Sequence, residues 1–184
     1  MRGWFASCFS GSAKVDTESS IKVFYGSESG TTKNLALRLR QLGAQRSVSI
    51  VVAGLETFEP TALASNGKII FLTASYGTGG PTTNAADFHK WLAATDTLLP
   101  PFEFCVFGVG SSIYADSFNG MGKYVHARLT KRGGRAFYPL GLGDSLVDLD
   151  HDFLLWETGL WAALQAPREA HSPKADCERE RHLW

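Results

Sequence analysis

Hydroxyl side chains gather in one short segment near the start of the chain. Ser27, Ser29, Thr31 and Thr32 supply four hydroxyls around Gly30. Hydroxyls and the free N–H groups of a helix N-terminus bind anions, and a glycine lets the backbone approach them. The Gly-Lys-Ser/Thr of a triphosphate-binding loop is absent. A loop of neutral donors therefore predicts a site for a single terminal phosphate, and an ordinary turn with a helix cap is the alternative.

Two tyrosines stand beside glycine-rich elements further along the chain. Tyr76 precedes Gly77-Thr78-Gly79, and Tyr114 follows Gly108-Val109-Gly110. A dinucleotide fingerprint needs a third glycine and a place after the first strand, and neither condition holds. The glycines instead indicate main chain lying against something flat, and the two tyrosines could sandwich a planar ring. Two ordinary half-buried tyrosines are the alternative.

The rest of the chain alternates strand and helix patterns. Five short apolar runs rich in β-branched or aromatic residues predict strands over 21–26, 47–54, 68–75, 102–110 and 135–141. Apolar residues at helical spacing follow, in groups that include Leu35 and Leu39, Phe88 and Leu92, Phe118 and Val125, and Phe153 and Leu160. The 55–66 connection fits neither pattern. This alternation predicts a doubly wound α/β fold, a five-stranded parallel sheet with helices on both faces.

Ligands of doubly wound sheets bind beyond the carboxyl ends of the strands. The hydroxyl-rich loop follows the first predicted strand, and the two tyrosine loops follow the third and the fourth. The fold therefore brings the three loops to one edge of the sheet. Together they predict a ligand with a flat ring and a terminal phosphate.

Composition sets the remaining limits. The chain has 184 residues with 18 Lys and Arg against 18 Asp and Glu, which suits one soluble domain and argues against a nucleic-acid binder. No apolar run approaches the roughly 20 residues that span a membrane. The pattern predicts one domain over 21–166, a flexible N-terminal segment over 1–20 and a charged C-terminal tail over 167–184. Three widely spaced cysteines indicate a reducing, cytoplasmic location, and the histidines show no metal-ligand spacing.

Four ordered blocks of the sequence carry a family resemblance. They read VFYGSESGTTKNLALRL, ASYGTGGPTTNAADFHKWL, FCVFGVGSSIYADSFNGMGKYVHARL and GLGDSLVDLDHDFLLW. In these blocks the chain resembles the FMN-binding, flavodoxin-like domain of diflavin reductases, above all the microsomal NADPH–cytochrome reductases. The resemblance implies the strand order 2-1-3-4-5 and FMN as the cofactor.

The resemblance also implies a set of cofactor-binding residues. By position, the FMN phosphate loop consists of Ser27, Glu28, Ser29, Gly30, Thr31 and Thr32, and the isoalloxazine ring lies between Tyr76 and Tyr114. The residues that line the edge of the ring are Ala74, Ser75, Gly77, Thr78 and Gly79. The pocket is completed by Gly108, Val109, Gly110, Ser111, Phe118, Asn119 and Asp144. Gly77 is the candidate for turning a backbone carbonyl toward N5 of the flavin, because glycine tolerates both signs of φ.

The sequence departs from the family at several positions. Diflavin reductases usually carry acidic residues at the positions of Thr78 and Gly80, and asparagine at that of Ser111. Three residues separate Tyr114 from Phe118, as in the flavodoxin domain of tRNA wybutosine-synthesis enzymes, where microsomal reductases have two. The printed sequence does not include the FAD and NADPH modules of a diflavin reductase, and we expect these functions to lie on a separate protein. We therefore expect an electron carrier supplied by a separate flavin reductase, not a complete NADPH-dependent reductase.

Charges are unevenly distributed along the C-terminal half. Acidic residues without any Lys or Arg occupy 136–167, namely Asp144, Asp148, Asp150, Asp152 and Glu157. Just before them lies a basic run of Lys123, Arg128, Lys131, Arg132 and Arg135. The pattern predicts a polarised surface whose acidic patch, Asp144, Asp148, Asp150 and Asp152, steers a basic redox partner. A solvated helix face explains such a run equally well.

Three functions remain open on the sequence alone. The first is an FMN-binding domain that shuttles single electrons between a flavin reductase module and an acceptor protein. The second is a flavodoxin-type quinone reductase, which needs a nicotinamide site. The third is an interaction module that keeps the fold without the flavin, an alternative that Gly80 and Ser111 allow.

Overall fold

The computed structural model describes residues 20–64, 67–94 and 96–165, so the predicted tails lie outside the described residues except for Ser20. The sheet is parallel throughout, and its strands lie in the order β2-β1-β3-β4-β5, which confirms the doubly wound fold class. Its strands are β1 (Ile21–Gly26), β2 (Ile50–Gly54), β3 (Lys68–Ala74), β4 (Phe102–Gly110), β5 (Gly134–Ala136) and β6 (Gly141–Asp144).

The predicted fifth strand over 135–141 is wrong in its bounds, because two short strands share that position. β5 pairs with the first residues of β4, Phe102–Phe104, and β6 pairs with the last ones, Phe107–Gly110. Pro139 lies between them and has no N–H to donate to a sheet. Its carbonyl instead accepts a hydrogen bond of 2.9 Å from the indole N–H of Trp156. The chain thus leaves the sheet and rejoins it in time to deliver Asp144 to its carboxyl edge.

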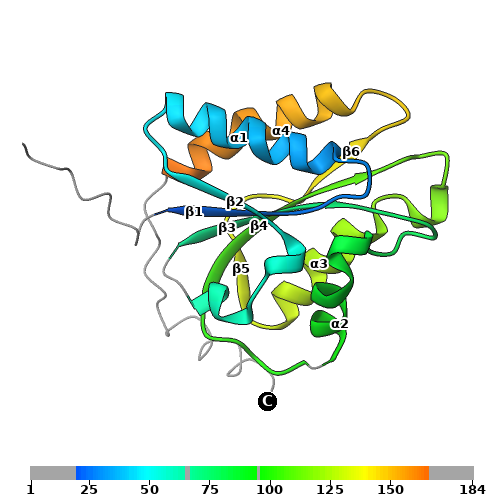
Figure 1. Ribbon diagram of the computed structural model, residues 1–184, viewed down its shortest axis with the longest axis horizontal. Coiled ribbons are helices and arrows are strands. Elements are labelled where there is room, and N and C mark those ends of the chain that lie inside the picture. Colours follow the sequence, from blue (N-terminus) through cyan, green and yellow to red (C-terminus); the bar gives the residue numbers. More distant parts are fainter. Residues whose placement is uncertain (1–19, 65–66, 95, 166–184) are drawn as a thin grey trace, which may run out of the picture.

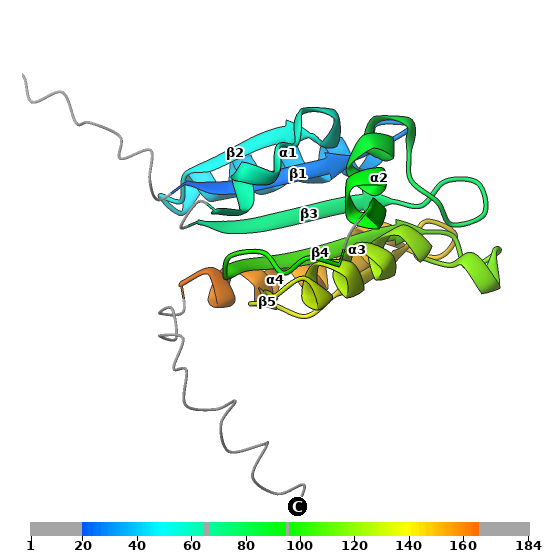
Figure 2. The ribbon, with the colours of Figure 1, turned by 90° about the horizontal axis from the view of Figure 1, so that it is seen from below.

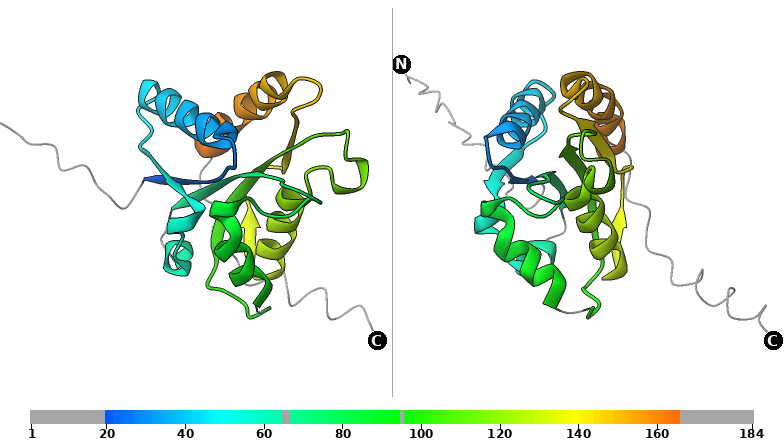
Figure 3. Two further views of the ribbon diagram at one scale, coloured as in Figure 1. Left: turned by 45° about the vertical axis from the view of Figure 1, so that its right-hand side comes forward. Right: turned by 90° about the vertical axis from the view of Figure 1, so that its right-hand side faces the viewer.

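The helices cover both faces of the sheet, as Figures 1 and 3 show. On one face lie α1 (Thr31–Gln45) and α4 (Leu149–Gln165), and on the other lie α2 (Ala86–Ala94) and α3 (Gly120–Lys131). The undecided 55–66 connection contains two short 3-10 helices, η2 (Leu55–Thr57) and η3 (Pro60–Ala64). Two further 3-10 turns, η4 (Thr83–Ala85) and η5 (Ala115–Ser117), lie in the loops after β3 and β4.

Each face of the sheet has its own hydrophobic core. Leu39 and Phe153 pack with Phe107 of β4 on the α1–α4 side, and Phe88 and Leu129 pack on the opposite side. All five side chains are almost completely buried. The prediction that these residues form the buried faces of helices is confirmed. Burial of such an apolar stripe holds an amphipathic helix on a sheet.

Two elements begin later than the sequence pattern predicts. β2 starts only at Ile50, because the chain first has to leave α1. Ser47 adopts a positive φ of 57°, and the N–H of Val48 donates to the carbonyl of Gly43. Phe118 lies outside α3, since Asn119 also has a positive φ, of 55°, and the helix begins at Gly120. A residue with left-handed backbone geometry changes the direction of the chain at each of these points. The spacing of apolar residues does not reveal such a residue.

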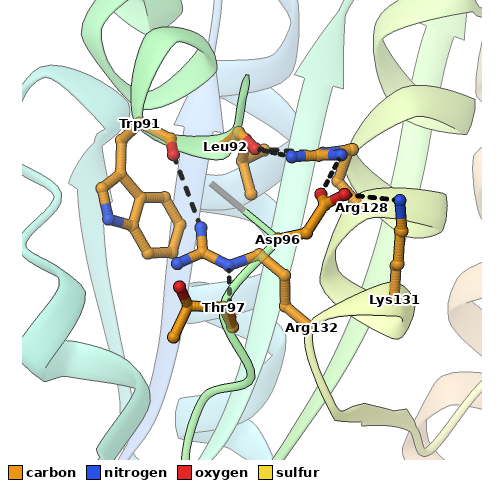
Figure 4. Close-up of polar contacts among 7 residues, drawn as sticks. All are labelled: Trp91, Leu92, Asp96, Thr97, Arg128, Lys131 and Arg132. Carbon is orange, nitrogen blue, oxygen red and sulfur yellow. Dashed lines mark hydrogen bonds and ion pairs between the residues drawn. The ribbon is translucent and has the colours of Figure 1, made fainter. Parts of the chain in front are cut away.

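The basic run of α3 serves the fold. Figure 4 shows that Arg132 reaches across to the end of α2, donates to the carbonyls of Thr97 (3.2 Å) and Trp91 (3.4 Å), and lies 4.1 Å from the centre of the Trp91 ring. Arg128 donates to the carbonyl of Leu92 (3.0 Å) and pairs with Asp96. The last turn of α2 contains no cation. Side chains at the C-terminal end of α3 therefore satisfy carbonyls in the last turn of α2.

The predicted polarisation of the surface is accordingly weaker than the sequence suggests. Lys131 also pairs with Asp96 (2.6 Å), Arg135 pairs with Glu103, and Arg132 is only 2% exposed. Lys123 donates to the carbonyl of Phe118 (2.8 Å). Each of the five cations thus has an acceptor within the protein, and Lys123, Lys131 and Arg135 are nevertheless exposed.

Removal of the Arg132 guanidinium should destabilise the domain. The substitution Arg132→Met keeps an apolar stem against Trp91 but loses two hydrogen bonds and the ring contact, so we expect the free energy of unfolding to fall by about 2–3 kcal/mol. Urea unfolding measures this change. Arg40→Met is the matched control, because Arg40 is exposed on α1, and its effect should stay within about 0.5 kcal/mol. Equal effects of the two substitutions would contradict the account.

Candidate functional site

Loops after four strands meet at the carboxyl edge of the sheet. Figure 2 shows the loops that follow β3 and β4 projecting together beyond the strands. They enclose a cavity of about 740 Å³. Twelve of the twenty residues predicted from the sequence line it: Glu28, Ser29, Thr31, Ala74, Ser75, Tyr76, Gly77, Gly79, Val109, Gly110, Ser111 and Tyr114. The predicted convergence of the three loops on one cavity is confirmed.

The hydroxyl-rich loop divides into a facing part and a supporting part. Ser29 and Thr31 line the cavity, and their hydroxyl oxygens lie 3.1 Å apart. Thr32 is buried and donates to the carbonyl of Gly26 (2.7 Å), so it holds the loop rather than facing the cavity. The buried Ser27 hydroxyl has no hydrogen-bond partner within the described ranges.

The N-terminus of α1 is open to an anion. Gly30 occupies the N-cap position with a φ of 92°, and no described side chain caps the helix. A helix that starts this way leaves backbone N–H groups without partners. These groups point toward the end at which Ser29 and Thr31 lie, which is the arrangement that binds a phosphate.

Glu28 is turned to a neighbouring loop. Its two carboxylate oxygens accept hydrogen bonds from the N–H (2.8 Å) and the hydroxyl (3.0 Å) of Thr83. The sequence places Glu28 in the predicted phosphate loop but does not predict its hydrogen bonds with Thr83. The side chain thus ties the phosphate loop to the η4 turn.

Two exposed tyrosines flank the cavity. Tyr76 is 58% exposed and Tyr114 is 62% exposed, so each has ring surface that the protein itself leaves uncovered. Tyr76 exchanges two backbone hydrogen bonds with Gly80, of 3.0 and 2.9 Å, which closes a tight hairpin. Gly77 (φ 56°) and Gly79 (φ 88°) turn the chain between them. The glycines hold Tyr76 at the cavity wall, and Thr78 lies exposed at the tip of the hairpin.

The second Gly-x-Gly element has a packing role that the sequence does not predict. A Cβ atom on Gly108 would lie 2.6 Å from the side-chain oxygen of Asn119, and one on Gly110 would lie 2.6 Å from its backbone nitrogen. Asn119 is fully buried and donates to the carbonyl of Gly143 (3.1 Å). These two glycines make room for Asn119, so close packing by itself requires glycine at both positions.

Asp144 joins two walls of the cavity. One of its oxygens accepts from the N–H groups of Ser112 (3.0 Å) and Leu146 (2.9 Å). A hydrogen bond from the Ser112 side chain, followed by the backbone N–H bonds of Leu146 and Ser112, holds the pKa of the Asp144 carboxyl below its usual value. Asp144 does not itself line the cavity. It fixes the loop of Tyr114 against the loop after β6.

The contribution of Asp144 to stability should depend on pH. Because its pKa is lower in the folded chain, the contribution is present above the unfolded pKa and is lost as the pH falls through the folded one. Asp144→Asn keeps an acceptor oxygen but does not titrate. We expect this variant to be less stable than the wild type at about pH 6 and to match it more closely near pH 3. Urea unfolding at both values tests this, and a pH-independent difference would contradict it.

Some predicted residues stand behind the cavity wall, and some lining residues were missed. Those that do not line it are Ser27, Gly30, Thr32, Thr78, Gly108, Phe118, Asn119 and Asp144. Thr82, Ser117 and Ser145 line it without having been predicted. All three are hydroxyl residues in loops that follow strand ends. That position was the available signal, because every loop at the carboxyl edge can reach a ligand.

The geometry defines a class of protein. A doubly wound parallel sheet carries at its carboxyl edge an uncapped helix N-terminus with hydroxyls and two tyrosines with free ring surface, which is a site for a flat ring bearing a phosphate. The family model for flavodoxin matches residues 23–156. The chain belongs to the flavodoxin family.

Solved flavodoxins share the fold. A cysteine-to-alanine mutant of flavodoxin from Pseudomonas aeruginosa has a TM-score of 0.68 at 21% identity, covering 80% of this chain and 99% of that one. The oxidised flavodoxin 1 from Bacillus cereus has a TM-score of 0.65 at 19% identity, covering 82% and 99%. The similarity extends over nearly the whole of each flavodoxin and shows that the fold is shared.

Curated relatives are more similar in sequence. NADPH–cytochrome P450 reductase from Homo sapiens is 39% identical over 153 residues, which are 80% of this chain and 22% of that protein. The protein of that name from Salmo trutta is 36% identical, and 25% of it is covered. The chain thus spans about a quarter or less of the length of these relatives.

FMN is the cofactor that fits this site. The uncapped N-terminus of α1 suits its single phosphate, the Ser27 hydroxyl is buried without a partner among the described residues, and the tyrosines suit its ring. A triphosphate would need a cation in the loop, and the described residues that line the cavity include none. Within 20–64, 67–94 and 96–165, no helix is long and apolar enough to cross a bilayer.

Proposed function

We propose that the chain is an FMN-dependent carrier of single electrons, which takes them from a flavin reductase and passes them to a redox protein. The observation that carries this proposal is the pair of exposed tyrosines that flank a cavity rich in hydroxyl side chains. Bound FMN supplies a redox centre that accepts and releases electrons one at a time. The tyrosines hold its ring at the protein surface, where a partner can approach.

The residues around the ring favour one-electron exchange. The described lining contains neither lysine nor arginine, so little compensates added negative charge on the ring. The Gly77 carbonyl in the tight hairpin is the proposed acceptor for a proton at N5. We expect photoreduction of the FMN-loaded protein to show a distinct half-reduced spectrum. Direct conversion from the oxidised to the fully reduced spectrum would overturn the one-electron proposal, and steady NADPH oxidation by the isolated chain would favour a quinone reductase.

The proposed docking surface is the acidic start of α4 together with the apolar residues beside it. Asp148 and Asp150 are exposed, whereas Asp144 and Asp152 are half-buried and joined by a hydrogen bond from the N–H of Asp144 to the Asp152 carboxylate (2.9 Å). The neighbouring Val147 is 78% exposed. Acids in the first turn of α4, here Asp150 and Asp152, also stabilise the helix itself. Because Asp144 and Asp152 are half-buried, only the exposed pair is assigned to the partner.

Salt dependence tests this surface. Electron delivery to cytochrome c should slow as salt rises, and the double variant Asp148→Asn with Asp150→Asn should be slower at low salt and less sensitive to it. Glu59→Gln is the control, because Glu59 is an exposed acid outside the cavity. A rate that ignores salt in the wild type would overturn the acidic patch without affecting the flavin site.

We also propose a reducing, cytoplasmic location. Cys105 is fully buried in the α1–α4 core, and burial raises the pKa of its thiol well above the usual value. Such a thiol packs as a small apolar group. Cys8 and Cys177 lie outside the described residues. Localisation of the tagged full chain in its native cells tests this proposal.

A further inference from the structure

Asn84 of η4 is the centre of a hydrogen-bond network behind the phosphate loop. Its side-chain oxygen accepts from the N–H of Ser27 (2.8 Å) and the hydroxyl of Thr82 (2.9 Å). Its side-chain nitrogen donates to the carbonyl of Tyr25 (3.2 Å) and to the carboxylate of Glu56 (2.8 Å). The partners fix which atom is oxygen, since two are donors and two are acceptors. All four hydrogen bonds that an amide side chain can readily make are therefore in use.

These contacts tie three separate segments together. Tyr25 is the last residue but one of β1, Ser27 begins the phosphate loop, and Glu56 lies in η2 after β2. The neighbouring Thr83 holds Glu28 through two further hydrogen bonds. Residues 25–28 are thus fixed from a loop that follows a different strand, while Ser29 is left to face the cavity.

We propose that Asn84 is a positioning residue that sets the selectivity of the site for a phosphorylated flavin. It acts through the backbone of the phosphate loop and does not line the cavity. The hydrogen bonds of Asn84 hold the phosphate loop and not the tyrosines. Loss of Asn84 should therefore weaken binding of the phosphate and leave binding of the flavin ring unchanged. This inference rests on the proposed binding of FMN.

Exchange of the amide and the carboxylate between positions 84 and 56 tests this role of Asn84. Asn84→Asp keeps the shape of the side chain but sets a carboxylate against the Glu56 carboxylate and the Tyr25 carbonyl. We expect the Kd for FMN to rise by roughly tenfold, since two hydrogen bonds become repulsive contacts. The Kd for riboflavin, which has the ring without the phosphate, should change by less than about twofold. Adding Glu56→Gln returns an amide donor to the pair and the original net charge, so it should restore most of the FMN affinity.

Asn34→Asp is the matched control. Asn34 is an exposed amide near the start of α1, so this substitution adds the same negative charge close to the loop without touching the network. A purely long-range repulsion of the phosphate would weaken FMN binding in this variant as well. Positioning by Asn84 predicts that the control stays near the wild type. Binding is followed by quenching of flavin fluorescence on protein whose fold is checked by circular dichroism.

The outcomes separate the inference from the proposed function. Selective loss of FMN with recovery in the double variant supports the inference. Equal loss of both flavins, or no recovery, overturns it while the wild type still binds FMN. A wild type that binds neither flavin overturns the proposed function and the inference together. Asn84→Ala, which removes all four bonds without adding charge, is the second variant if Asn84→Asp does not fold, and failure of both to fold would show a folding role and overturn the inference.

Discussion

Replacement of Gly122 with valine should lower the free energy of unfolding by about 3 kcal/mol and abolish flavin binding. A Cβ atom at Gly122 would lie 2.7 Å from the Cα atom of Gly108. The obstacle is backbone of the fully buried strand β4, not the flexible end of a side chain. The new side chain must therefore push α3 away from the sheet. This movement displaces Asn119, which directly precedes α3 and packs on Gly110.

Chemical unfolding and FMN titration measure the two effects of Gly122→Val. The matched control is Ala127→Val in the same helix, because Ala127 is exposed and a valine there costs only the lower helix propensity of about 0.5 kcal/mol. The control should keep full FMN binding. A stable Gly122→Val protein that binds FMN normally would mean that α3 does not lie against β4 as described.

Removal of either flanking ring should weaken FMN binding strongly. Stacking of a flat ring on an aromatic side chain is worth about 1–3 kcal/mol by alanine substitution, which corresponds to roughly tenfold to a hundredfold in Kd. We therefore expect losses of that size for Tyr76→Ala and for Tyr114→Ala. Both side chains are more than half exposed, so neither substitution opens a core cavity. Stability should change little, within about 0.5 kcal/mol.

Phenylalanine at either position separates stacking from hydrogen bonding. Tyr76→Phe and Tyr114→Phe keep the ring and should bind FMN within a few-fold of the wild type. Riboflavin binding should fall together with FMN binding in the alanine variants, because the ring is common to both ligands. If Tyr114→Ala bound FMN as well as the wild type did, the flavin would lie elsewhere in the cavity.

Periodicity was sufficient for the sheet and its helices. Phe88 and Leu92 repeat at the spacing that buries one face of a helix, and both are buried against the sheet. It was insufficient where one residue redirects the chain. Pro139 lies between β5 and β6, the two short strands that pair with β4 in place of one predicted strand. Asn119 has a positive φ, so α3 begins only after it. Such local geometry depends on the tertiary contacts around the residue.

The candidate site was predictable at the level of its loops. The order of the strands brings Ser29 and Tyr76 to one cavity, and the carboxyl-edge rule requires it. The role of each side chain was less accessible. Thr32 and Glu28 carry the right chemistry for a phosphate, yet their hydrogen bonds run to Gly26 and Thr83. A hydroxyl or a carboxylate has several possible partners, and only the folded chain selects one.

The charge pattern shows the same limit. Arg132 and Arg128 read as part of a free basic patch, but they satisfy carbonyls at the end of α2. The need for such partners arises only when the helix end is brought next to α3. Sequence order does not record that proximity, so the run of cations was assigned to the surface.

An absorbance spectrum of the purified protein, taken before and after addition of FMN, FAD and riboflavin, tests the central claim most directly. The account predicts visible flavin bands that remain after gel filtration with FMN, weaker retention of riboflavin, and FMN as the flavin released on denaturation. A folded protein that stays colourless in excess FMN would contradict it, because the loops around Tyr76 and Tyr114 would then not form a flavin site.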